Sequence, residues 1–498
     1  MTQPNAAAPS SARPSPGATS STAASSAESG FAHLIDGERV TGTEWLDVIN
    51  PATGRPFARC PAAGRAELDR AVAAARRAAD DWRDRSFDER RDAIRRMAQV
   101  LREHDAELAE LLTREQGKPI GQARAEVTRA ATQAEGMAAI PIEPELLLED
   151  DTRRIELRYF PLGVVGIITP WNAPINLAAG PLTSALYTGN AAILKPSPYT
   201  PLATLRMGEL LAPVFPRGTL NVLAGGDELG ASMTAHPRID KISFTGSVES
   251  GKQVMASAAG TLKRVTLELG GNDAAIVLDD ADPQAIAPKL FFACFVNSGQ
   301  VCMAVKRIYA HESVYEALCD ALAAQARKAK VGDGFEPGVE LGPIQNEAQY
   351  DRVIGLLEDT RRSGARILAG GVVPAGPGYF FPPTLVADID ERSRLVREEQ
   401  FGPIVPILKY RDVDDAVRRA NDTRYGLSGS VWGRDTARAA AIAARLEVGT
   451  AWVNQHRATL ATVPFGGAKE SGIGRQYSVL GLKSYMEPRV ISILKSPL

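Results

Sequence analysis

The sequence predicts an α/β fold with more than one domain. From about residue 160, short apolar runs of strand length, each ended by Gly, Pro, Asn or Ser, alternate with stretches of helical periodicity. Such alternation is typical of parallel sheets covered by helices on both faces. The chain has 498 residues, more than the ~100–200 residues usual for one domain. A second series of strand-like and helical segments after residue 300 predicts a second α/β domain.

The elements follow in chain order. A helix is predicted over 66–82, because apolar side chains recur on one face, and charged helix follows to about 116. The residues of that face are Leu68, Val72, Ala75, Ala79 and Trp82. The predicted strands are 163–168, 191–195, 219–223, 239–244, 265–269, 274–278, 304–310, 365–368 and 428–433. The predicted later helices are 312–330, 347–363 and 412–421.

Two segments are predicted to form ribbons outside these layers. Residues 145–160 have the alternation of a hairpin, and 488–494 have that of a terminal strand. An isolated ribbon is marginal in water unless another edge pairs with it. Pairing with another subunit and pairing within the chain both remain open.

Composition excludes several classes of protein. A net charge of -2 gives no electrostatic footprint for nucleic acid, and no apolar run is long enough to span a membrane. The four cysteines and five histidines show no metal-ligand spacing, so no metal site is expected, and a reducing, cytoplasmic compartment fits best. Residues 1–30, rich in Ala, Ser, Pro, Thr and Gly, predict a disordered tail.

Two side chains are candidates for covalent and acid–base chemistry. Cys302 follows Gly299 and Gln300, which interrupt the apolar periodicity and place the thiol at a loop or element end. It is either a nucleophile or an inert buried thiol. Glu268 ends an apolar run before two glycines. It is either a general base whose pKa is raised by burial or a solvated strand end.

Two turns after predicted strands are candidates for ligand binding. The turn 244–251 leads from a strand into a helix, and its glycines would let a dinucleotide approach the helix N-terminus. Asn172, after the strand 163–168, could donate a hydrogen bond to an oxyanion. Either turn could also be purely structural.

Taken together and in this order, the motifs resemble those of the aldehyde dehydrogenase superfamily from about residue 31 to 498. They are PWN (170–172), LKPS (194–197), FTGS (244–247), LELGG (267–271), NSGQVC (297–302), EEQFGP (398–403), WVN (452–454) and PFGG (464–467). Eight collinear motifs make a chance match very improbable.

The resemblance implies oxidation of an aldehyde to a carboxylic acid. Cys302 matches the nucleophile, which forms a thiohemiacetal and then, after hydride transfer to a nicotinamide, a thioester. Asn172 and the Cys302 backbone N–H match the donors to the oxyanion. Glu268 matches the base that activates water for hydrolysis.

The resemblance also implies NAD as cofactor, with NADP possible. The matching positions are Ile168, Thr169, Trp171, Lys195, Ser197, Gly246, Ser247, Gly251, Leu269, Glu399 and Phe401. Glu399 matches the residue that holds the nicotinamide ribose. Pro198 stands where the family commonly has a Glu that binds the adenosine ribose, which leaves NAD versus NADP open.

The family fold implies a Rossmann-like dinucleotide-binding domain over 31–140 and 160–269 and a catalytic domain over 270–475. A small β arm over 141–159 and 484–498 would build a homodimer or homotetramer.

Substrate-pocket positions depart from the family pattern. The matching residues are Ala173, Asn176, Gly180, Arg457, Thr459 and Phe465. Three of them, Ala173, Gly180 and Thr459, are small where aromatic residues are common, which predicts a wide tunnel for a bulky aldehyde unless neighbours refill it. His456 and Arg457 indicate instead a polar or anionic substrate tail, although Gly180 argues against succinate semialdehyde, because relatives with that substrate often have Arg at the matching position.

Two other functions remain as alternatives. A CoA-acylating semialdehyde dehydrogenase would transfer the thioester to CoA, but such enzymes typically lack the Glu that is present here at 268. A catalytically silent structural homologue would not need Cys302, Glu268 and Asn172 to be intact.

Overall fold

A computed structural model describes residues 30–495. The expected disordered tail at 1–30 therefore lies outside the described residues apart from Gly30, and so does the end of the expected arm at 496–498.

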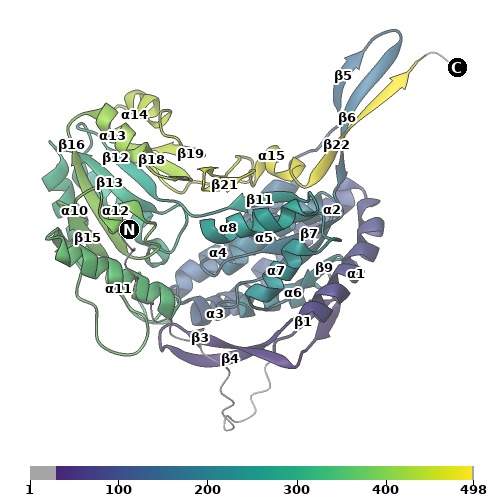
Figure 1. Ribbon diagram of the computed structural model, residues 1–498, viewed down its shortest axis with the longest axis horizontal. Helices are drawn as coiled ribbons and strands as arrows, with labels where there is room; N and C mark the ends of the chain where they lie inside the picture. Colours follow the sequence, from purple (N-terminus) through teal and green to yellow (C-terminus); the bar gives the residue numbers. More distant parts are fainter. Residues whose placement is uncertain (1–29, 496–498) are drawn as a thin grey trace, which may run out of the picture. The chain divides into compact units, whose positions relative to one another are not determined.

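The first large sheet runs in the order β2-β1-β9-β8-β7-β10-β11-β21 (Figure 1). Its central strands, from β9 to β11, are parallel, whereas β1, β2 and β21 join antiparallel at the edges. The strands are β1 (His33–Ile35), β2 (Glu38–Val40), β7 (Val164–Ile168), β8 (Ala191–Lys195), β9 (Leu220–Val222), β10 (Lys241–Thr245), β11 (Arg264–Glu268) and β21 (Gly472–Ile473).

Helices cover both faces of this sheet because neighbouring residues of a strand point to opposite sides. In β7, Val165 and Ile167 pack into one core, and Val164 and Ile168 pack into the other. The first core is completed by α2 (Phe87–Glu103), α3 (Asp105–Gln116), α4 (Ile120–Ala138), α5 (Pro174–Tyr187) and α6 (Leu202–Leu211). The second is completed by α1 (Arg65–Arg83), α7 (Asp227–Ala235) and α8 (Val248–Ala259).

The second large sheet runs in the order β14-β15-β16-β13-β12-β18-β19, parallel except for β14. Its strands are β12 (Asp273–Val277), β13 (Val305–His311), β14 (Arg366–Ala369), β15 (Thr384–Ala387), β16 (Ile404–Tyr410), β18 (Ser428–Trp432) and β19 (Thr450–Val453). One face packs on α9 (Pro283–Phe295) and α10 (Tyr315–Lys328). The other packs on α11 (Glu347–Arg362), α12 (Arg394–Arg397), α13 (Val413–Asn421) and α14 (Thr436–Ala443).

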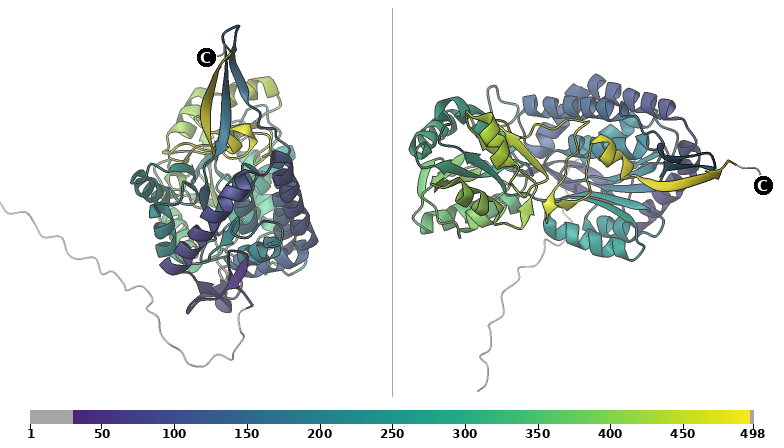
Figure 2. Two further views of the ribbon diagram at one scale, coloured as in Figure 1. Left: turned by 90° about the vertical axis from the view of Figure 1, so that its right-hand side faces the viewer. Right: turned by 90° about the horizontal axis from the view of Figure 1, so that it is seen from above.

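The predicted hairpin and terminal strand form one ribbon, in the order β22-β6-β5, that extends away from the large sheets (Figures 1 and 2). It consists of β5 (Glu145–Glu149), β6 (Arg153–Pro161) and β22 (Met486–Leu494), which follows α15 (Ser478–Lys483). Of the two alternatives for the terminal strand, pairing within the chain is therefore realised. Two smaller pairs are β3 (Glu44–Asn50) with β4 (Arg55–Ala62) and β17 (Tyr425–Gly426) with β20 (Ala468–Lys469).

The α/β class and the predicted strands are confirmed, with ends that differ by one or two residues. The continuous charged helix predicted to about 116 is wrong, because the chain breaks between α1 and α2 and again at His104. Ser86 explains the first break: its Oγ accepts from the Glu89 N–H, and the Glu89 carboxylate accepts from the Ser86 N–H. This reciprocal capping box begins a new helix.

Within residues 30–495, no helix is both long and apolar enough to cross a lipid bilayer. The same part of the chain contains no group of His, Cys, Asp and Glu side chains that could hold a metal ion.

Candidate active site

The turn before Cys302 has a left-handed backbone. Asn297, Ser298 and Gly299 have φ of 54°, 56° and 73°, a region that is costly for residues other than glycine. A Cβ on Gly299 would lie 2.5 Å from the Gly402 carbonyl oxygen. The turn that follows α9 is therefore tightly constrained, and it fixes the position of the backbone that leads to Cys302.

Side-chain hydrogen bonds hold this turn in place. The Asn297 side-chain amide donates to the Asn172 carbonyl at 2.9 Å, and the Ser298 hydroxyl donates to the Gly342 carbonyl at 2.7 Å. The Gln300 side chain donates to the Asn297 carbonyl and accepts from the Gln345 N–H. These bonds offset the backbone cost and connect the turn to the loop after β7 and to the loop before α11.

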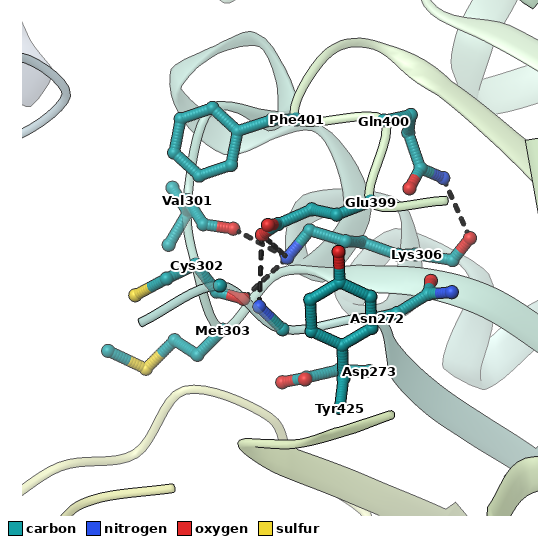
Figure 3. Close-up of polar contacts among 12 residues, drawn as sticks. Asn272, Asp273, Val301, Cys302, Met303, Lys306, Glu399, Gln400, Phe401 and Tyr425 are labelled. Carbon is teal, nitrogen blue, oxygen red and sulfur yellow. Dashed lines mark hydrogen bonds and ion pairs between the residues drawn. The ribbon is translucent and has the colours of Figure 1, made fainter. Parts of the chain in front are cut away.

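The side chain of Lys306, on β13, forms hydrogen bonds with the backbone at Cys302. Its ammonium donates to the Val301 carbonyl at 3.0 Å and to the Cys302 carbonyl, and it lies 3.3 Å from the Glu399 carboxylate. Figure 3 shows these bonds on one side of Cys302, while the sulfur points away from Lys306. The carbonyl of Cys302 is thus fixed, while its sulfur takes no part in these contacts.

Cys302 lies where two cavities meet. It lines cavity A, of about 200 Å³, and cavity B, of about 140 Å³. Asn172 and Leu177 are the other residues common to both linings. Burial raises the pKa of the Cys302 thiol to about 12, and the positive charge of Lys306 opposes this. The thiol can therefore meet molecules arriving from two sides.

Asn172 is positioned to donate a hydrogen bond at this junction. Its side-chain amide donates to the Gln300 carbonyl at 2.9 Å. An amide carries two N–H donors, so one remains for a ligand atom next to Cys302. Asn172 follows β7, as the sequence indicated.

Cavity A brings together residues from six separate parts of the sequence. Six of the expected cofactor residues line it: Trp171, Gly246, Ser247, Leu269, Glu399 and Phe401. The rings of Trp171 and Phe401 meet edge-to-face with centroids 5.3 Å apart. The Glu399 carboxylate accepts a hydrogen bond from the Gly271 N–H at 3.0 Å. The same carboxylate lies so close to Gly270 that any side chain at that position would collide with it.

Five expected cofactor residues do not line cavity A. Ile168 and Lys195 lie opposite each other at the ends of β7 and β8, and the Thr169 N–H donates to the Lys195 carbonyl at 3.1 Å. Ser197 lies in the turn after β8, and Gly251 lies in α8 against Leu269. These residues surround the same carboxyl edge of the first sheet.

The residues at this edge fit a dinucleotide. Lys195 is 3% exposed, and burial lowers its pKa to about 8. Its ammonium makes one long hydrogen bond, 3.4 Å, to the Pro196 carbonyl, and the Thr169 hydroxyl is buried without a partner. Ser247 caps α8, whose N-terminus faces cavity A. Unsatisfied donors beside a helix N-terminus suit ribose hydroxyls and phosphates.

Glu268 ends β11 but lines neither cavity. Its side chain is buried beside Gly466, and neither carboxylate oxygen has a hydrogen-bond partner among the described residues. Burial raises the pKa of Glu268 well above its usual range, and the charge of Arg475 opposes this. Its charge also contributes to raising the pKa of Cys302, so the two groups lie within electrostatic reach of each other.

Cavity B contains three of the expected substrate-pocket residues, Ala173, Asn176 and Arg457. Gly180, Thr459 and Phe465 lie outside its lining. A Cβ on Gly180 would contact the Tyr477 ring at 3.6 Å, so the expected extra room at Gly180 is absent because Tyr477 fills it.

The other two positions are also engaged elsewhere. Gln133 donates to the Thr459 hydroxyl at 3.4 Å and accepts from the Tyr477 hydroxyl at 3.2 Å. Phe465 is buried and pairs through its backbone with Gln476. His456 is also excluded from cavity B, because its ring bonds Ser430 and the Met303 carbonyl.

Sequence reasoning missed Lys306 and Tyr477. Lys306 lies in a predicted strand whose flanking residues are buried on both faces, and a charge inside such a run is a signal of a buried partner. Tyr477 has a φ of 57°, and no local pattern indicates that it contacts Gly180.

The fold and the site define an α/β protein in which a thiol lies between a cavity at the carboxyl edge of a parallel sheet and a second cavity. The sequence profile of the aldehyde dehydrogenase family matches residues 39–491. A Pseudomonas protein named "Probable aldehyde dehydrogenase" is 39% identical over 93% of this chain and 95% of its own length. A Sinorhizobium fredii protein named "Probable succinate-semialdehyde dehydrogenase [NADP(+)]" is 38% identical over 90% and 92%.

Solved structures agree. Betaine aldehyde dehydrogenase from Staphylococcus aureus, in complex with NAD+, superimposes with a TM-score of 0.91 at 32% identity, covering 95% of this chain and 96% of that one. A mutant aldehyde dehydrogenase from Bacillus cereus gives 0.90 at 35% identity, covering 93% and 96%. The chain belongs to the aldehyde dehydrogenase family and has its fold.

Proposed function

We propose that this enzyme oxidises an aldehyde to a carboxylic acid through a covalent intermediate on Cys302. The observation that carries the proposal is the position of the Cys302 sulfur, at the junction of cavities A and B. A substrate carbonyl in cavity B and a cofactor in cavity A would then meet at this atom.

The Cys302 thiol gives its proton to water, and the resulting thiolate attacks the carbonyl carbon, so that a C–S bond forms while the C=O π bond opens to an oxyanion. The developing oxyanion accepts hydrogen bonds from the Asn172 side chain and the Cys302 backbone N–H. Because Lys306 holds the Cys302 carbonyl, the sulfur starts from a fixed backbone. Loss of a hydride from the substrate carbon then leaves a thioester on the sulfur.

NAD or NADP, when bound, supplies the acceptor for that hydride. Trp171, Gly246, Ser247, Leu269, Glu399 and Phe401 would hold it in cavity A, and Ile168, Thr169, Lys195, Ser197 and Gly251 would hold it along the adjoining edge. The S. aureus relative was solved with NAD+, and the S. fredii relative is named for NADP(+).

Glu268 is proposed as the base for thioester hydrolysis. It is a buried carboxyl without hydrogen bonds, and burying such a group costs about 1–3 kcal/mol. A rotation that brings it to the thioester would therefore lose no hydrogen bond. Water deprotonated by Glu268 attacks the acyl carbon, the C–S bond breaks and the acid leaves.

The proposal is tested with an aldehyde panel, NAD and NADP, following absorbance of the reduced cofactor. Cys302→Ala should abolish oxidation, and Cys319→Ala is the matched control because Cys319 is a fully buried thiol in α10. Glu268→Gln should give a first burst of reduced cofactor and then slow turnover. Equal steady-state rates for Glu268→Gln and wild type would refute the base assignment, and stimulation by CoA would favour the CoA-acylating alternative.

We also propose that the β22-β6-β5 ribbon pairs subunits into a dimer or tetramer. Apolar side chains on it are exposed, namely Leu146, Leu147, Leu148, Val490, Ile493 and Leu494. Exposed apolar edges are typical of interfaces. Sedimentation of the full chain and of a Leu147→Glu variant tests the assembly.

All four cysteines are free thiols, which supports a cytoplasmic location.

A further inference from the structure

Cavity B carries an excess of positive charge. Four of its lining residues have charged side chains, namely Lys118, Glu126, Arg129 and Arg457. Lys118 and Glu126 form an ion pair whose side chains are 4% and 6% exposed. Lys118 also donates to the Asn172 carbonyl, and Glu126 accepts from the backbone at the start of α5. The charges of this pair are therefore satisfied within the protein.

The two arginines have no such partner. Within residues 30–495, neither Arg129 nor Arg457 makes a hydrogen bond or an ion pair with a protein group, and the Arg457 Nε is buried. The Arg457 guanidinium lies over the ring of Phe292, 5.6 Å from its centroid. Burial, together with the positive charge of Arg129, lowers the pKa of Arg457 to about 10. The two cations therefore lie within each other's electrostatic field.

Arg129 is exposed to solvent, whereas the Arg457 Nε is buried without a hydrogen-bond partner, and burying an unpaired cation is unfavourable for the protein alone. Arg457 additionally has a φ of 67°, in the left-handed region. A ligand that supplies an anion would remove both the unpaired burial and the repulsion. The planar guanidinium donates two parallel hydrogen bonds to a carboxylate, which makes this group the natural counterpart.

We propose that the substrate is an aldehyde that also carries a carboxylate, with the carboxylate held by Arg457 and Arg129 and the carbonyl at Cys302. The proposal rests on the proposed function, since it assigns the far end of the same substrate. The volume of cavity B, about 140 Å³, is below the ~300–1,000 Å³ of sites for drug-sized ligands. The substrate is accordingly a short aliphatic semialdehyde rather than a bulky aromatic aldehyde.

The test compares two four-carbon aldehydes, succinate semialdehyde and butanal, in the holoenzyme with excess cofactor. We expect the wild type to favour the carboxylated aldehyde in kcat/KM by at least tenfold. Arg457→Gln and Arg129→Gln should each lower this ratio at least fivefold. Arg124→Gln is the matched control: Arg124 is exposed on the same helix, α4, but does not line cavity B, so the ratio should stay unchanged.

The outcomes separate the two proposals. Oxidation of butanal and succinate semialdehyde with equal kcat/KM would overturn the carboxylate assignment and leave the proposed function standing. If no aldehyde of the panel, including these two, reduces the cofactor, the proposed function fails, and calorimetry on the Cys302→Ala variant decides whether cavity B binds the carboxylate. Binding of succinate semialdehyde that Arg457→Gln removes would support the anion site, and its absence would overturn it.

Discussion

Replacing Glu268 by Gln removes an ionisable group from a site that offers it no hydrogen bond. The side chain is 5% exposed, and burial raises its pKa well above the usual range. The folded protein therefore binds this proton more tightly than the unfolded chain does. The stability contributed by the protonated group is fully present below the unfolded pKa of 4.5 and is lost as pH rises through the folded pKa.

The size of the effect follows from the shift. Each unit by which the folded pKa exceeds the unfolded one lowers the free energy of unfolding by about 1.4 kcal/mol once pH is above both values. For a domain of 150–250 residues, about 1 kcal/mol corresponds to about 2–4 °C in Tm. A neutral Gln carries no pH-dependent term, so its own cost of burial is the same at every pH.

The assay is thermal unfolding of wild type and Glu268→Gln at pH 5 and pH 8. We expect the Tm of the variant to rise relative to wild type between the two pH values by several degrees. Glu228→Gln is the matched control, because Glu228 is exposed on α7, and its Tm difference should stay constant. A Tm difference between Glu268→Gln and wild type that does not change with pH would show that burial does not raise the pKa of Glu268.

Three further changes test the site. Asn172→Ala removes the proposed oxyanion donor and should lower kcat by about 10²–10³, measured at saturating aldehyde; an unchanged kcat would contradict the role. Lys306→Gln removes the cation that lowers the pKa of Cys302, so alkylation of Cys302 by iodoacetamide at pH 8 should slow severalfold, and a faster reaction would contradict the electrostatics. Gly299→Ala places a methyl 2.5 Å from a carbonyl oxygen at a φ of 73°, which should lower Tm by several degrees and slow the same alkylation; wild-type values for both would show that the turn tolerates a side chain.

The layers of the fold could be predicted because their signals are local. The strand β7 is a run of apolar residues ended by Thr-Pro, and its alternate residues serve two cores. The break between α1 and α2 was missed although Ser86 and Glu89 have the spacing of a capping box. The pairing of β22 with β6 could not be chosen in advance, because the edge that a strand finds is decided by contacts distant in sequence.

The sequence motifs at Asn172, Gly246 and Cys302 also predicted residues that the structure brings to the walls of cavity A. The substrate side could not be predicted in this way. Small residues at Gly180 and Ala173 indicate space only if nothing else enters it, and at Gly180 the Tyr477 ring does. A sequence shows which side chains are missing from a pocket, but not which distant ones replace them.

The two sides of the site are joined through one ammonium group. Lys306 bonds the carbonyl of Cys302 and also pairs with Glu399, whose carboxylate lines cavity A (Figure 3). Displacing Glu399 would remove the carboxylate with which the buried Lys306 ammonium forms an ion pair, and breaking a buried ion pair is unfavourable. The position of the Cys302 backbone and that of the Glu399 carboxylate are therefore energetically coupled, although Lys306 itself lines neither cavity.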